Sequence, residues 1–167
     1  RNFPFQPTTK QNIFFQQIAE FITNTNDNEI FVLKGYAGTG KTTVISTIVN
    51  NLVEINKKYV LLAPTGRAAK VIANYSHKPA FTIHKKIYFP KKNSGGGVSF
   101  TMQQNKHKNT FFIVDEASMI SDTNSESKLY ENGSLLDDLI SYIYSGTNCK
   151  MILLGDTAQL PPVNLDI

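Results

Sequence analysis

Residues 35–43, GYAGTGKTT, combine glycines, threonines and one lysine within nine positions. Gly35, Gly40, Lys41 and Thr42 fit the pattern G-x-x-x-x-G-K-[ST], in which glycines let successive backbone N–H groups turn toward a phosphate. The lysine can reach the β- and γ-phosphates, and the threonine hydroxyl can bind Mg²⁺. An ordinary glycine-rich turn is the alternative. An apolar run before the loop and a helical pattern after it favour nucleotide binding, because the start of a helix attracts phosphate.

Two acids, Asp115 and Glu116, follow directly on the apolar run FFIV. One carboxylate can hold the Mg²⁺ shell of a bound nucleotide, and its neighbour can polarise an attacking water as a general base. A pair of solvated loop acids is the alternative. A small-molecule kinase would not need a base for water, and the sequence has no N-K-x-D motif for reading guanine. The two clusters together therefore favour hydrolysis of ATP.

Alternating apolar runs and helical patterns must position these groups. Continuous apolar runs, typical of strands buried on both faces, predict strands at 30–34, 59–63, 110–116 and 150–156. Apolar spacing at three and four residues predicts helices at 8–22, 41–54, 66–75, 81–88 and 134–146. We expect Ser134 to be the N-cap and Gly146 the C-cap of the last helix. The alternation predicts an α/β fold with a parallel sheet and helices on both faces, with ligands at the carboxyl ends of the strands.

The charge distribution is uneven along the 167 residues, a length sufficient for one domain with a core. Residues 57–114 contain 11 basic residues and no acid, whereas residues 115–167 contain 2 basic and 9 acidic residues. Such a basic segment is typical of a protein that binds a polyanion such as nucleic acid, although a solvated lysine-rich surface would look the same.

The remaining composition bears on the compartment. The single cysteine, Cys149, precedes an apolar run, so we expect a buried thiol rather than a catalytic one. One cysteine allows no internal disulfide, which fits a reducing compartment. No apolar run is long enough to cross a membrane and no signal peptide is visible, so a cytoplasmic location without a membrane partner is expected.

Two further motifs, LLAPTGRAAK and GDTAQLPPV, complete an ordered set with GYAGTGKTT and FFIVDEASM. With these four motifs in this order, the chain resembles the N-terminal motor domain of superfamily 1 DNA helicases, and most closely the RecD/Dda-like branch, which moves 5′→3′ on single strands. The resemblance extends over nearly the whole chain. It implies a P-loop NTPase fold of the RecA-like type over residues 1–167, with ATP and Mg²⁺ as cofactors.

The resemblance also implies roles in the nucleotide site. Gln11 would read the adenine edge, although a capping box with Thr8 is a rival role for the same side chain. Lys41 and Glu116 would be catalytic, and Gln159 would sense the γ-phosphate and couple it to the nucleic acid. Thr42 and Asp115 would hold Mg²⁺. The remaining nucleotide contacts implied by the loop are Gly35, Gly38, Thr39, Gly40 and Thr43.

Single-stranded or fork DNA is the partner that the resemblance implies. Its channel would be lined by two motifs within the basic segment, APTGRAAK and TIHK. The implied DNA contacts are Pro64, Thr65, Gly66, Arg67, Thr82 and His84. A buried structural role is the alternative for His84. The polar, glycine-rich stretch 90–109 lies where relatives insert a small subdomain, so we expect a short basic hairpin-like insertion at about 88–109, near the fork.

The second RecA-like domain of such helicases is absent from these 167 residues. It would supply an arginine that stabilises the transferring phosphoryl group. The sequence contains only Arg1 and Arg67, so we expect an incomplete motor with little turnover alone. The rival interpretations are another P-loop ATPase of the AAA+ type, or a module that binds nucleotide or DNA without catalysis.

Overall fold

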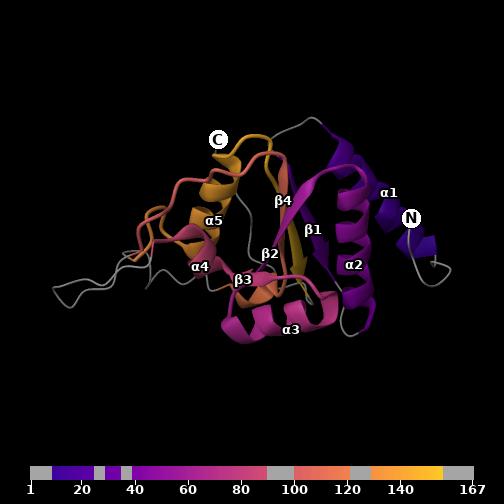
Figure 1. Cartoon of the computed structure of the whole chain (residues 1–167), viewed down its shortest axis with the longest axis horizontal. Helices are drawn as coiled ribbons and strands as arrows, with labels where there is room; N and C mark the ends of the chain where they lie inside the picture. The colour runs from indigo at the N-terminus through magenta and orange to yellow at the C-terminus, as the bar shows by residue number, and fades with distance from the viewer. Residues whose placement is uncertain (1–8, 25–28, 35–38, 90–99, 121–128, 156–167) are drawn as a thin grey trace.

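A parallel sheet forms the centre of the computed structural model, which describes residues 9–24, 29–34, 39–89, 100–120 and 129–155 (Figure 1). Within these residues the strands are β1 (Ile30–Lys34), β2 (Lys58–Ala63), β3 (Ala80–Thr82), β4 (Thr110–Val114) and β5 (Lys150–Gly155). All neighbouring strands are parallel, in the order β1-β5-β4-β2-β3. The α-helices are α1 (Thr9–Thr23), α2 (Thr39–Glu54), α3 (Gly66–Ser76), α4 (Ile83–Ile87) and α5 (Leu135–Tyr144). A short 3₁₀ helix, η1 (Ala117–Met119), follows β4. The predicted α/β fold with a parallel sheet is confirmed.

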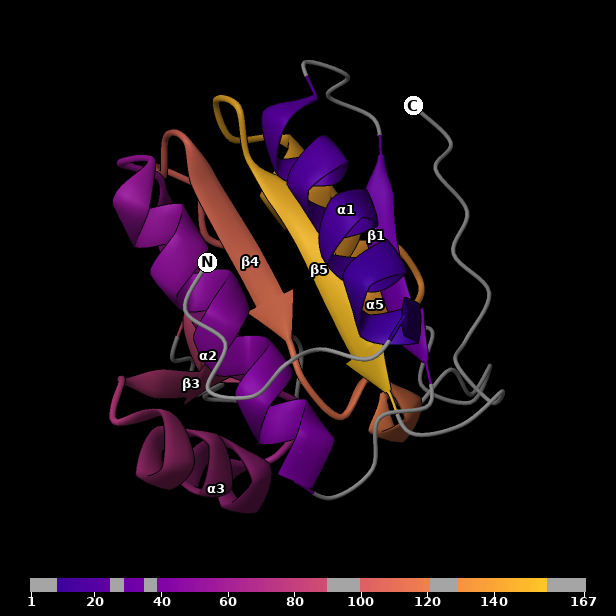
Figure 2. The same ribbon diagram turned by 90° about the vertical axis from the view of Figure 1, so that its right-hand side faces the viewer.

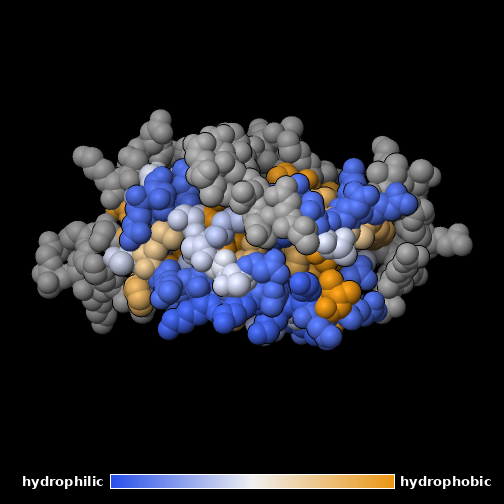
Figure 3. All heavy atoms as spheres, turned by 90° about the horizontal axis from the view of Figure 1, so that it is seen from above, coloured by the Kyte–Doolittle hydropathy of each residue, from blue (hydrophilic) through white to orange (hydrophobic). Residues whose placement is uncertain are grey.

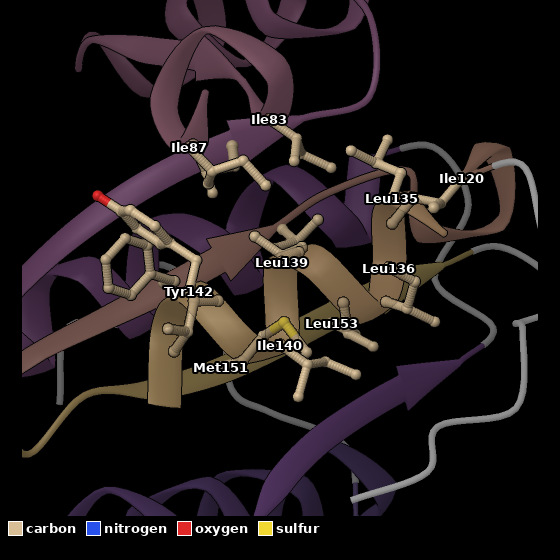
Figure 4. Close-up of a cluster of buried hydrophobic side chains, with 14 of the residues drawn as sticks. Ile83, Ile87, Ile120, Leu135, Leu136, Leu139, Ile140, Tyr142, Met151 and Leu153 are labelled. Carbon is tan, nitrogen blue, oxygen red and sulfur yellow. The ribbon is translucent and has the colours of Figure 1, made fainter. Parts of the chain in front are cut away.

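Helices cover both faces of the sheet, as predicted. Figure 2 shows α1 and α2 in front of β4 and β5, with α5 behind them. On the first face, apolar side chains of α1, α2 and α3 pack with those of the strands in one buried cluster. On the second face, Ile83 and Ile87 of α4 lie toward Leu139 of α5 in another buried cluster (Figure 4). Removal of this apolar surface from water is the main stabilising contribution.

Burial of the strands depends on their place in the sheet. Every residue of β4 and of β5 is buried, which confirms the prediction of strands buried on both faces. The same prediction is wrong for β1, where the Val32 side chain is 38% exposed. The reason is that β1 is the outermost strand of the described sheet and pairs only with β5. A short apolar run does not reveal which strand lies at an edge.

The segment from residue 81 to residue 88 is only partly helical. Residues 80–82 instead form β3, which pairs in parallel with β2 from Leu61 to Ala63. The helix begins at Ile83, and the Thr82 side chain accepts a hydrogen bond from the Lys85 backbone N–H at 3.2 Å. Hydrogen bonds to β2 stabilise the extended backbone of residues 80–82, and local apolar spacing could not predict this pairing.

The end of α5 corrects another expectation. Ser134 is the N-cap as predicted, accepting from the Asp137 backbone N–H at 3.1 Å, but the C-cap is Ser145 and not Gly146. A Cβ atom at Gly146 would lie 2.4 Å from the Asn105 side-chain nitrogen and 2.9 Å from the Cys149 sulfur. Glycine is needed there for close packing, because Asn105 Nδ2 donates to the Tyr142 and Ile143 carbonyls that end the helix.

Two buried residues, Cys149 and Lys150, lie at the amino end of β5. Lys150 opens β5 with 2% of its surface exposed, and its ammonium donates to the Phe21 carbonyl at 3.1 Å and to the Asn24 carbonyl. A cation at the carboxyl end of α1 is stabilised by the helix dipole. Cys149 is buried, as predicted, and burial raises the pKa of its thiol.

None of the helices in the described parts of the chain combines the length and the apolar character of a membrane span. Hydrophilic residues dominate the coloured surface in Figure 3, with small apolar groups between them.

Candidate functional site

The carboxyl ends of β1, β5 and β4 lie side by side at one edge of the sheet. The register pairs Lys34 at the end of β1 with Gly155 at the end of β5, and Leu153 of β5 with Val114 at the end of β4. Neighbouring strands are about 4.8 Å apart, so the loops that follow β1 and β4 start roughly 10 Å from each other. The phosphate-loop motif and the paired acids, which are distant in sequence, therefore emerge at one edge.

The phosphate-loop motif lies between a strand and a long helix, as its chemistry requires. β1 ends at Lys34, and α2 begins at Thr39 and runs for 16 residues. Gly40, Lys41 and Thr42 thus lie in the first turn of α2, where backbone N–H groups lack helical partners and attract an anion. Gly35 and Gly38 fall outside the described residues, as do the side chains at 39–42, so their phosphate and Mg²⁺ contacts stay predictions.

Beyond the first turn of α2, the Thr47 hydroxyl donates a hydrogen bond to the Thr43 backbone carbonyl at 2.8 Å. Gln11 belongs to α1 by its backbone, but its side chain is not described, and Gln159 lies outside the described residues. The choice between adenine recognition and helix capping for Gln11 therefore stays open.

Asp115 is held firmly at the end of β4, with 3% of its surface exposed. Its backbone N–H donates to the Leu62 carbonyl at 2.9 Å. The Glu116 backbone N–H donates to Asp115 Oδ1 at 2.8 Å, and the Tyr75 hydroxyl donates to Oδ2 at 3.1 Å. Burial and the nearby Asp115 carboxylate raise the pKa of Tyr75 well above its ordinary value, so the phenol remains a donor.

Glu116 adopts a backbone conformation that is costly for its residue type. Its φ of 54° lies in the left-handed region, and it forms the N-cap of η1 without a side-chain capping bond. Non-glycine residues held in this region often occur at functional sites. The half-buried side chain therefore leaves β4 in a direction set by a strained turn rather than by a regular strand or helix.

The start of α3 presents the next group of predicted contacts. Thr65 is its N-cap and accepts from the Ala68 backbone N–H at 3.1 Å. Thr65, Gly66 and Arg67 are exposed, Pro64 is half-buried, and no atom lies within 4 Å of a Cβ built on Gly66. A hydroxyl that accepts one hydrogen bond can still donate to a phosphate oxygen. The geometry leaves the start of this 11-residue helix accessible to an anion.

His84 lies in a different setting from Thr65. It is half-buried in an aromatic cluster formed with Tyr88, Phe100 and Tyr130. Its Nε2 atom lies 3.2 Å from the Tyr130 hydroxyl, within hydrogen-bond distance. These contacts favour the structural role for His84, whereas Thr82 two residues earlier is the N-cap of α4. A contact between either residue and DNA stays a prediction.

The segment around 88–109 pairs at its base. Tyr88 and Met102 form an antiparallel bridge, and the Phe89 backbone N–H donates to the Thr101 carbonyl at 2.9 Å. Asn105, further along, is buried against the end of α5. Residues 90–99 lie outside the described part of the chain. A variant that shortens this insertion should therefore retain the residues from Phe100 onward.

Tyr75 and the Tyr88–Asp138 pair are polar contacts that the sequence patterns did not predict. The Tyr88 hydroxyl donates to Asp138 Oδ2 at 2.6 Å in the buried face of α5. Local sequence patterns do not predict partners 40 and 50 residues apart. An acid at an otherwise apolar helix position is the signal that could have indicated the second pair.

The chain matches known proteins over most of its length. A protein family described as AAA domain matches residues 17–165. An uncharacterized protein, R530, of Acanthamoeba polyphaga mimivirus is 34% identical, over 93% of this chain and 33% of that protein. The ATP-dependent RecD2 DNA helicase of Deinococcus radiodurans is 26% identical, over 89% of this chain and 18% of its own length.

A crystal structure of the Pif1 helicase from Candida albicans has a similar fold, with a TM-score of 0.54 and 22% identity over 96% of this chain and 34% of that one. The RecA-like P-loop fold that the sequence resemblance implied is thereby confirmed. The chain spans between 18% and 34% of the length of these three proteins.

Proposed function

Because the chain belongs to the AAA domain family and is a motor domain of the RecD/Dda-like branch of superfamily 1 helicases, we propose that it binds ATP at the carboxyl edge of the sheet. We further propose that it couples ATP hydrolysis to movement along single-stranded DNA and to duplex unwinding. The observation that supports this most is the meeting of the phosphate-loop helix and the Asp115–Glu116 turn at one edge.

The residues of this chain would divide the work as follows. The first turn of α2 and Lys41 would bind the phosphates, and Gln11 would contact adenine. Thr42 and Asp115 would hold Mg²⁺, whose role when bound is to neutralise charge on the transferring phosphoryl group. One buried carboxylate suits this ion, which proteins usually bind through one or two carboxylates together with substrate phosphates.

Glu116 would act as the general base toward the attacking water, and Gln159 would sense the γ-phosphate. The exposed start of α3 and Thr82 would contact backbone phosphates of the single strand without reading bases. The exposed Lys70, Lys78 and Lys85 on or next to α3 and α4 would add long-range attraction.

A second RecA-like domain would supply the arginine for turnover, since relatives of this chain are several times longer. The insertion near residues 88–109 would lie close to the fork. Deleting residues 91–98 is then expected to lower unwinding by a two-domain protein while its ATP hydrolysis stays unchanged.

Measurement of ATP hydrolysis, with and without single-stranded DNA, tests this function. We expect little turnover by this chain and DNA-stimulated turnover by a longer product of the same gene that includes a second domain. Glu116→Gln should reduce that turnover at least about 100-fold, the usual contribution of a general base. Equal, DNA-independent rates in both proteins would contradict a helicase, and binding without turnover in both would indicate a non-catalytic module.

A further inference from the structure

The hydrogen bond between Tyr75 and Asp115 connects two parts of the candidate site. Tyr75 lies in the last turn of α3, and Asp115 follows β4. The Tyr75 hydroxyl lies 3.1 Å from Asp115 Oδ2, although the two residues are 40 positions apart. Figure 1 shows α3 at the end of the sheet where β4 leads into η1. Tyr75 belongs to none of the four sequence motifs.

Packing of α3 fixes the position of the Tyr75 ring. Ala69 and Ile72 of α3 are buried in the cluster that includes α2 and β2, and the Tyr75 side chain packs against the same cluster. The residues at 72 and 75 are three positions apart and therefore lie on one face of the helix. His77 then ends α3 in a left-handed conformation. The phenol is thus directed toward Asp115 by the buried face of the helix.

The opposite end of α3 carries exposed residues that would contact the single strand. Thr65 caps this end, and Gly66 and Arg67 form its first turn. A helix rises about 1.5 Å per residue, so Gly66 and Tyr75 are separated by roughly 14 Å along a continuous helix. A shift of α3 caused by a bound strand would therefore also shift the phenol that contacts Asp115.

We propose that Tyr75 is a positioning residue for Asp115 and that, through this contact, α3 links occupancy of the single-strand site to Mg²⁺–nucleotide binding. A hydroxyl that donates to a carboxylate makes a charge-assisted hydrogen bond, which restricts the orientation of the acceptor. The proposal rests on the function proposed above, because it takes Asp115 as an Mg²⁺ ligand and the start of α3 as a DNA contact.

Tyr75→Phe tests the link because it removes the hydroxyl and retains the packed ring. Tyr59→Phe is the matched control, since Tyr59 lies near the amino end of β2, whereas the candidate site lies at the carboxyl ends of the strands. Binding of a fluorescent ATP analogue is titrated with Mg²⁺, with and without a thymidine oligonucleotide. We expect Tyr75→Phe to require about 5-fold more Mg²⁺ for half-maximal binding, equivalent to losing one modest hydrogen bond. The change in this midpoint caused by the oligonucleotide should also disappear.

The other outcomes separate the link from the proposed function. For Tyr75→Phe, the affinity for the analogue without Mg²⁺ and the thermal unfolding midpoint should match those of Tyr59→Phe. A loss of Mg²⁺-independent binding in Tyr75→Phe would indicate a merely structural role and overturn the proposal. An Mg²⁺ midpoint and an oligonucleotide response equal to wild type would also overturn it, while leaving the proposed function intact. Failure of the wild-type chain to bind either the analogue or the oligonucleotide would overturn both.

Discussion

Two buried carboxylates, Asp115 and Asp138, have similar partners in two different regions of the molecule. Each accepts a tyrosine hydroxyl and a backbone N–H, from Tyr75 and Glu116 in one case and from Tyr88 and Asn132 in the other. Asp138 is fully buried, its tyrosine bond measures 2.6 Å, and Asn132 Nδ2 donates a further bond at 2.8 Å. The tyrosine bond to Asp115 measures 3.1 Å.

The two carboxylates differ in their surroundings. Asp138 lies within α5 and joins that helix to Tyr88 at the end of α4 and to the turn at Asn132, so its bonds hold three segments together. Asp115 follows the end of β4, beside the left-handed Glu116, at the edge of the sheet from which the loop between β1 and α2 also starts. The comparison teaches that hydrogen-bond partners alone do not distinguish an acid of the scaffold from a candidate site acid, whereas position does, because Asp115 follows a strand and Asp138 lies within a helix.

Asp138→Ala should produce the largest effect, because it leaves the Tyr88 hydroxyl without its buried acceptor. We expect a loss of about 3 kcal/mol or more in the free energy of unfolding, measured by urea denaturation. Asp137→Ala is the control, since that exposed neighbour contributes only about 0.5 kcal/mol at the helix start. Equal losses in the two variants would mean that the Asp138 network is not a scaffold.

Two glycines extend the same comparison between scaffold and site. Gly146→Ala should cost about 2 kcal/mol of stability, because the new methyl group would overlap Asn105 and Cys149. Gly66→Ala, where the space is open, should change stability by less than about 1 kcal/mol. It should nevertheless weaken binding of a thymidine oligonucleotide if a strand approaches the backbone there. Thermal unfolding and fluorescence anisotropy measure the two effects, and equal stability losses would contradict the packing argument.

Tyr88→Phe should remove about 1 to 2 kcal/mol and flatten the alkaline pH dependence of stability. Burial and the hydrogen bond to Asp138 raise the pKa of Tyr88, with smaller contributions from Tyr130 and Glu131. The unfolded phenol ionises near pH 10, while the folded one keeps its proton. Unfolding therefore releases a proton above about pH 10, so stability falls as pH rises through this range.

Urea denaturation of wild type and Tyr88→Phe between pH 8 and about 11 checks this sign. The difference in unfolding free energy between the two proteins should shrink as the pH rises. A constant difference over the whole range would show that the Tyr88 proton does not contribute.

Glu116→Gly should have a small effect on stability, and in the favourable direction. Releasing a non-glycine residue from φ of 54° should increase the unfolding free energy by about 1 kcal/mol. His77→Gly is the matched control, because His77 has φ of 55° at the exposed end of α3 and no predicted role in chemistry. Both changes should raise the melting temperature in calorimetry, but only Glu116→Gly should abolish ATP hydrolysis by a two-domain protein. Destabilisation by Glu116→Gly would contradict the strain at the site.

Much of this fold could be predicted from local patterns. Continuous apolar runs indicated β2, β4 and β5, and helical spacing indicated α2 and α3, because burial of those faces dominates their stability. Patterns failed where pairing across the sheet decides the outcome, as at β3, which is stabilised by hydrogen bonds to β2. They failed also at Gly146, whose neighbours are Asn105 and Cys149 rather than the cap of its own helix.

The candidate site shows the same division. Residue types and spacing placed Asp115 and Glu116 at a strand end and the phosphate loop before α2, because each motif is local. The contact from Tyr75, the strained φ of Glu116 and the aromatic surroundings of His84 depend on segments brought together only by folding. Sequence spacing carries no information on such distant neighbours.

Nucleotide binding by wild type and Lys41→Ala tests the central claim most directly. Binding of a fluorescent ATP analogue is measured in the presence of Mg²⁺, with circular dichroism to verify that both proteins are folded. We predict saturable binding by wild type and affinity at least about 50-fold lower for Lys41→Ala, because the proposed role of this lysine is to bind the β- and γ-phosphates at the start of α2. Equal affinities in two folded proteins, or the absence of binding by wild type, would contradict a nucleotide site at this edge of the sheet.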